Sequence, residues 1–134
     1  MPFAITHMPG EPILIVRIEI PLDQHLPSAT SVFSQLAHLA RTSSAGLFIL
    51  IDLRGQAPLF SDVLIGMQFF SELESGSEQH SARLVLVGSD PMLRIAVKRI
   101  KRQFGLDVVR FDTLEHALAY ARAENARTDR LDEE

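Results

Sequence analysis

The stretch "LFILIDL" at residues 47–53 decides the fold class of this chain of 134 residues. It is apolar without interruption up to Asp52. A strand with one face in water alternates apolar and polar residues, whereas an uninterrupted run is typical of a strand buried on both faces of a parallel sheet. The stretch "RGQAPLFSD" at residues 54–62 then leads into a predicted helix. Such a connection can be an active-site loop, a regulatory switch or a plain turn.

The segments on either side continue this pattern of strands and helices. Two short β-type runs at residues 2–8 and 13–20 are separated by the turn "PGEP" and predict a hairpin. Apolar spacing then predicts helices over residues 28–42, 61–75, 90–105 and 113–125, and strands over residues 47–53, 82–88 and 106–111. The order ββαβαβαβα predicts an α/β fold with a mostly parallel sheet, right-handed crossovers and an antiparallel N-terminal hairpin at one edge.

Length and composition predict a single globular domain. Residues 1–124 are enough to bury a core, and the polar residues 125–134 are expected to form a disordered tail. The chain has no cysteine, which excludes disulfides, thiolate nucleophiles and zinc sites built on cysteine. We see neither a signal peptide nor an apolar run of membrane-spanning length, so we expect a cytoplasmic protein. A formal net charge of −4 argues against nucleic acid as a partner.

Recognisable catalytic patterns are absent from the sequence. The five histidines are scattered, with no His-x-x-x-His pair and no glutamate at metal-binding spacing. The stretch "GSDP" holds a single glycine and does not predict a phosphate-binding loop, and the Gly-x-Ser-x-Gly motif of serine hydrolases does not occur. We therefore predict a protein without enzymatic activity and without a resident metal or cofactor.

The loops that follow the predicted strands meet at one rim of the sheet, where ligands usually bind in α/β folds. The candidate ligand-binding residues of this rim are Asp52, Arg54, Ser89 and Asp90. Together with Asp112, the aspartates could form a metal or phosphoryl site. The favoured alternative is structural: Ser89 or Asp90 caps one helix, Asp112 or Thr113 caps the next, and Arg54 holds Asp52 to tie down the loop.

The predicted helix at residues 91–104 holds five of the thirteen basic residues of the chain. One face is apolar and contains Leu93, Val97, Ile100 and Phe104. The opposite face contains Arg94, Lys98, Lys101 and Arg102, flanked by Arg99. These cations form either a solvated face that favours the helix C-terminus, or a patch that attracts an acidic protein, a lipid surface or another anion.

The helix that begins near Ser61 is more apolar than a position over a sheet requires. A helix that covers one sheet face needs an apolar stripe of about 100°. The residues that supply that stripe are Val63, Gly66, Met67, Phe70 and Leu73. Further apolar residues extend beyond it, namely Leu59, Phe60, Leu64, Ile65 and Phe69. Either neighbouring helices bury the excess, or the excess forms a dimer or partner surface.

Several of these features together resemble a known family. They are the element order from Ile13 to Ala123, "IDLRG" at residues 51–55, the following Ser61, and "VVRFDTLEHALAYARA" at residues 108–123. In these features the chain resembles the STAS domains of anti-sigma-factor antagonists, and still more the SpoIIAA-like group of small bacterial proteins. Ser61 takes the place of the phosphorylated serine of the antagonists and Leu64 that of a leucine, while Phe60 replaces an acidic residue.

The resemblance implies a SpoIIAA-like fold and a non-enzymatic, protein-binding regulatory module. We expect it to bind a partner or itself, as a dimer, through residues 55–61 and the start of the following helix, with Leu59, Phe60, Ser61 and Leu64 in contact. Ser61 is a candidate phosphorylation site, and when unmodified it is expected to cap the helix. The alternative is a carrier or sensor of a small anionic or lipidic ligand, with a pocket at the strand-end rim.

Overall fold

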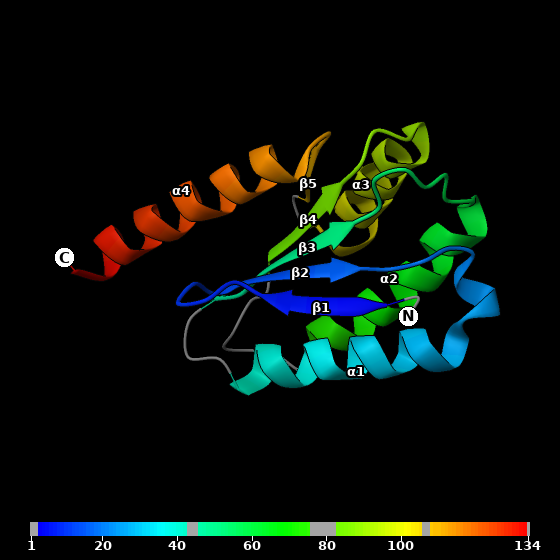
Figure 1. The fold of residues 1–134 in the computed structure, drawn as a ribbon, viewed down its shortest axis with the longest axis horizontal. Coiled ribbons are helices and arrows are strands. Elements are labelled where there is room, and N and C mark those ends of the chain that lie inside the picture. Colours follow the sequence, from blue (N-terminus) through cyan, green and yellow to red (C-terminus); the bar gives the residue numbers. More distant parts are fainter. Residues whose placement is uncertain (1–2, 43–45, 76–82, 106–107, 134) are drawn as a thin grey trace.

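The computed structural model describes residues 3–42, 46–75, 83–105 and 108–133, and Figure 1 shows their arrangement. The strands are β1 (Ala4–His7), β2 (Ile13–Arg17), β3 (Phe48–Asp52), β4 (Arg83–Val87) and β5 (Val109–Phe111). The helices are the 3-10 helix η1 (Leu22–Gln24) and the α-helices α1 (Leu26–Thr42), α2 (Phe60–Ser75), α3 (Pro91–Phe104) and α4 (Leu114–Glu133). Apart from η1, this is the predicted order ββαβαβαβα.

The described strands form one mixed sheet in the order β1-β2-β3-β4-β5. β1 pairs with β2 antiparallel, and each further neighbour is parallel. The edge hairpin turns at Gly10, whose φ of 72° suits a glycine, and the N–H of Glu11 donates to the carbonyl of Met8 at 3.1 Å. The predicted α/β class, the mostly parallel sheet and the antiparallel edge hairpin are confirmed.

Helices cover both faces of the sheet. In Figure 1, α1, α2 and α3 lie on one face and α4 lies on the other. All five residues of the central strand β3 are buried. Ile49 and Ile51 pack in the core cluster under α1, α2 and α3, while Phe48 and Leu50 pack in the cluster that includes the buried alanines of α4. The uninterrupted apolar run of this strand is therefore explained by burial on both faces.

The last helix is longer than the sequence pattern indicated. α4 continues to Glu133, so the expectation of a disordered tail at residues 125–134 is wrong for residues 125–133. Within this helix Arg127 donates to the carboxylate of Glu124 at 2.6 Å, and Arg83 of β4 reaches the same carboxylate at 2.9 Å. Oppositely charged residues three positions apart support a helix. The polar composition here therefore does not mark the end of the helix.

Candidate functional site

The loop between β3 and α2 is held to the segment that follows β2. Gly55 has a φ of 76°, and the N–H of Gln56 donates to the carbonyl of Leu53 at 3.1 Å, which closes a turn. The side-chain amide of Gln56 accepts the N–H of Ile20 at 2.9 Å and donates to the carbonyl of Ile18 at 2.5 Å. These contacts make the loop a fixed connection that delivers the chain to α2 in a defined position.

Asp62 connects the start of α2 to η1 through hydrogen bonds. Its carboxylate is buried, and it accepts the N–H of Leu59 through Oδ2 and the N–H of Leu22 in η1 through Oδ1, each at 2.7 Å. The first of these bonds satisfies a free N–H at the beginning of the helix. Ser61 is exposed and is the second residue of α2, so the expectation that it caps the helix is wrong.

The role of Asp62 could not be predicted from the sequence. An acidic residue in the first turn of a helix is already explained by the helix dipole, so its presence does not suggest a distant partner. The bond to Leu22 joins residues 40 positions apart, and this separation carries no local pattern. The sequence offers one sign of this role. Asp62 is the single acidic residue in the first turn of a helix whose first eleven residues are otherwise mostly apolar.

Apolar side chains are exposed at the start of α2 and on the adjacent part of α3. The exposed fractions are 60% for Leu59, 42% for Phe60 and 42% for Leu64, and Ile95 on α3 is also 42% exposed. Arg99 lies over the ring of Phe60, with its guanidinium carbon 4.9 Å from the ring centroid. Ile95 is one helical turn before Arg99. We call Leu59, Phe60, Leu64 and Ile95 the apolar patch.

Neighbouring helices bury part of the apolar excess of α2. Phe69 stacks on Phe33 of α1, with ring centroids 4.5 Å apart and an interplanar angle of 6°. Ile65 is partly buried against the same core cluster. α1 therefore covers one side of the helix, whereas the side that carries Phe60 and Leu64 stays exposed.

Asp52 is the last residue of β3, and its carboxylate accepts hydrogen bonds from two arginines. Arg54 donates to both carboxylate oxygens, from Nε at 2.8 Å and from Nη2 at 2.9 Å, and its backbone N–H reaches Oδ1 at 3.2 Å. Arg17 at the end of β2 adds a contact of 3.3 Å. Burial raises the pKa of Asp52, but the hydrogen bonds and charge of Arg54 and the charge of Arg17 outweigh it and hold the pKa below its ordinary value. The network ties the loop to the sheet.

Asp90 lies at the start of α3. Its Oδ1 accepts the N–H of Met92 at 2.9 Å, and Pro91 occupies the first helical position, so Asp90 caps this helix. Ser89 beside it is exposed. Of the two residues that could cap this helix, Asp90 is therefore the cap.

The loop between β5 and α4 also contains an arginine–aspartate pair and a helix cap. Arg110 donates to the carbonyl of Gly88 at 2.7 Å and to the carboxylate of Asp112 at 2.6 Å. Thr113 caps α4, because its Oγ1 accepts the N–H of His116 at 3.2 Å. Across the part of the chain that the structure describes, no group of three or more histidine and acidic side chains could hold a metal ion.

The cations of α3 are distributed around its outer surface. Arg94, Lys98, Lys101 and Arg102 are exposed, whereas Arg99 is half-buried beside Phe60. Lys101 and Arg102 lie in the last turn, where cations favour the negative end of the helix dipole. Arg110 and, to a smaller extent, Arg94 lower the pKa of Asp112. The basic surface therefore adjoins the apolar patch on one side and the end of β5 on the other.

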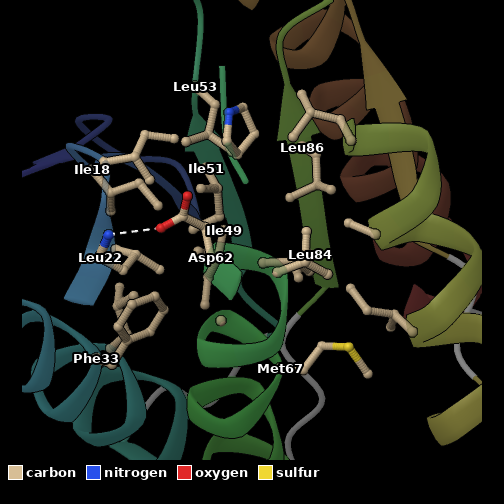
Figure 2. Close-up of a pocket in the computed structure, with 18 residues that line it drawn as sticks. Ile18, Leu22, Phe33, Ile49, Ile51, Leu53, Asp62, Met67, Leu84 and Leu86 are labelled. Atoms are coloured by element: carbon tan, nitrogen blue, oxygen red, sulfur yellow. Dashed lines mark hydrogen bonds between the residues drawn. The ribbon is translucent and has the colours of Figure 1, made fainter. Parts of the chain in front are cut away.

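An apolar cavity of about 100 Å³ lies between the sheet and helices α1, α2 and α3, and Figure 2 shows its lining. Its wall includes Ile18, Leu22, Phe33, Ile49, Met67 and Leu84. Asp62 is the one ionisable residue among the described residues that line it. None of the candidate rim residues Asp52, Arg54, Ser89 and Asp90 lines it. The cavity could not be predicted from the sequence, because voids in a core arise from packing and leave no periodic signal.

Comparison of the chain with protein-family models, with curated proteins and with solved structures found no match. The resemblance to STAS domains therefore stays a prediction. None of the helices, over the residues described, combines the length and the apolar character needed to cross a bilayer.

Proposed function

We propose that this protein is a non-enzymatic, STAS-like regulatory module that forms a dimer through the apolar patch. The observation that carries the proposal is the clustering of exposed apolar side chains. The described residues contain five exposed large apolar side chains, and three of them, Leu59, Phe60 and Leu64, lie within six positions at the start of α2. A fourth, Ile95, is one helical turn before Arg99, whose guanidinium lies over Phe60. Single exposed apolar residues need no explanation, but a cluster of them is typical of a binding surface.

The patch is rigidly supported, which favours binding. Gln56 fixes the preceding loop, and Asp62 fixes the first turn of α2 from inside. Arg99 positions the ring of Phe60 from the side of α3. Because these side chains are already held in place, a partner that contacts them does not have to order the loop first, and less of the binding free energy is lost.

A second copy of the chain is the partner that requires no further component. In a symmetric dimer the same surface contributes from both copies, so the apolar patch of one copy contacts the apolar patch of the other. A different protein with an acidic surface would also pair with the five cations of α3, and the experiment below distinguishes the two.

Ser61 gives this surface a means of regulation. Its side chain is exposed, and it follows Phe60 directly in the first turn of α2, three residues before Leu64. A phosphate there would place about two negative charges beside an apolar contact, and these would be partly desolvated on binding. Ser61→Asp is expected to weaken the dimer, while Ser61→Ala leaves it unchanged, as measured by sedimentation velocity.

The proposal is tested by sedimentation velocity over a concentration series. The double variant Phe60→Ser with Leu64→Ser is expected to raise the dimer dissociation constant at least about tenfold, because buried aromatic and aliphatic anchors dominate interface energies. Leu26→Ser on α1 is the matched control, since Leu26 is also 42% exposed but lies outside the patch. Circular dichroism checks that every variant keeps its fold.

Two results would contradict self-association through the patch. One is a wild-type protein that stays monomeric at the highest concentration reached, in which case a different acidic protein would be the occupant to seek. The other is an equal loss of association in the double variant and in Leu26→Ser, which would place the contact elsewhere.

A further inference from the structure

The cavity under α2 is separate from the proposed dimer surface. None of the four residues of the apolar patch lines it. Protein cores normally contain few voids larger than a water molecule, whereas this cavity has a volume of about 100 Å³. An engineered apolar cavity of roughly 150 Å³ stays dry and binds benzene or xenon. The volume here is smaller than that of the engineered cavity but of the same order, which limits a ligand to a molecule no larger than benzene.

Gly66 helps to keep this space open. It lies within α2, where glycine destabilises a helix relative to alanine. It lines the cavity, and a Cβ built on it would have no heavy atom within 4 Å. Neither packing nor backbone conformation therefore requires a glycine at this position. Its effect is to leave room beside Phe33 and Met67, two other residues of the wall.

The lining defines the class of ligand. Apart from the carboxylate of Asp62, the described lining side chains are apolar, and each oxygen of that carboxylate already accepts a backbone N–H. A charged or strongly polar molecule would lose its hydration without gaining enough partners. We propose that the cavity is a binding site for a small, uncharged, apolar molecule, about the size of one aromatic ring or of a short branched alkyl chain.

The site is tested by methyl NMR on the full chain titrated with benzene. Saturable shifts are expected for the methyl groups of Ile49, Ile51 and Leu84, which line the cavity, and not for those of the exposed Leu59 and Leu64. Gly66→Leu fills the space and is expected to weaken benzene binding at least tenfold. Gln68→Ala, on the exposed side of the same helix, is the control and is expected to bind benzene as the wild type does.

A second variant covers the case in which Gly66→Leu fails to fold. Met67→Ala removes a lining side chain and is expected to accept toluene with higher affinity than the wild type does. The proposal is overturned if neither the wild type nor Met67→Ala shows saturable shifts. It is equally overturned if the shifts at Leu59 and Leu64 match those at the lining residues, because benzene would then only adsorb to the surface. These readouts do not depend on dimer formation, so they separate the cavity from the apolar patch.

Discussion

The guanidinium of Arg99 lies over the ring of Phe60, 4.9 Å from its centroid. The contact joins the outer surface of α3 to the first residue of α2, and it holds an aromatic ring that is 42% exposed in a defined place. Cations prefer this position because the face of an aromatic ring is negative. The pair therefore links the basic helix and the apolar patch, two features that the sequence presents separately.

Replacement of Arg99 tests this link. Arg99→Ala is expected to lower the free energy of unfolding by about 0.5 kcal/mol, because a cation over an exposed ring contributes roughly that amount. Arg102→Ala removes an exposed cation from the last turn of the same helix and is the control, with a smaller expected loss. Urea unfolding measures both. Equal losses for the two variants would show that the contact with Phe60 adds nothing.

Asp62 is expected to be the most sensitive position at the start of α2. Asp62→Ala leaves the N–H groups of Leu22 and Leu59 without their acceptor, and we expect a loss of about 2 to 4 kcal/mol in the free energy of unfolding. Ser61→Ala, one residue earlier, is exposed and should change stability by less than about 0.5 kcal/mol. Comparable losses at the two positions would contradict the assignment of Asp62 as the helix anchor.

The network at Asp52 predicts a pH dependence of stability. The folded pKa of Asp52 lies below its ordinary value, which is about 3.9 in an unfolded chain. The carboxylate therefore contributes stability that is fully present above the unfolded pKa and is lost as the pH falls through the lower folded pKa. Asp52→Asn is expected to lower stability near neutral pH and to make the acid loss less steep, as measured by urea unfolding across this range. An unchanged acid slope would argue against the network.

Two glycines are expected to respond in opposite directions to the same substitution. Gly66→Ala should raise the free energy of unfolding by about 1 kcal/mol, because alanine favours the helix and its Cβ meets no atom within 4 Å. Gly88→Ala should lower it, because φ is 150° there and a Cβ would lie 2.8 Å from Leu93 Cδ1. Thermal unfolding compares them. A loss of stability in Gly66→Ala would mean that the space beside this helix is already filled.

The architecture could be predicted from the sequence because the relevant patterns are local. The uninterrupted run at residues 47–53 predicts a strand buried on both faces, and β3 is such a strand. Asp90 followed by Pro91 predicts a helix start, and α3 begins there. The exposure of Leu59, Phe60 and Leu64 follows from an apolar surface wider than one sheet face can cover.

What the sequence could not predict depends on contacts between distant residues. Asp62 reaches Leu22 across 40 positions, and Arg99 reaches Phe60 from a different helix. Residues 125–133 look like a tail because they are polar, yet they extend α4. The cavity depends on how three helices pack on the sheet, and a glycine within a helix was its only local sign.

Spin labelling tests the central proposal, dimer formation through the apolar patch, most directly. Because the chain has no cysteine, Gln68→Cys and Ala119→Cys each provide one labelling site per protomer. Gln68 is one turn after Leu64 on α2, whereas Ala119 is exposed on α4, across the sheet. Pulsed electron paramagnetic resonance should detect a distance between protomers that is shorter for labels at position 68 than at position 119. No intermolecular distance at either site, or a shorter distance at position 119, would contradict a dimer built on this surface.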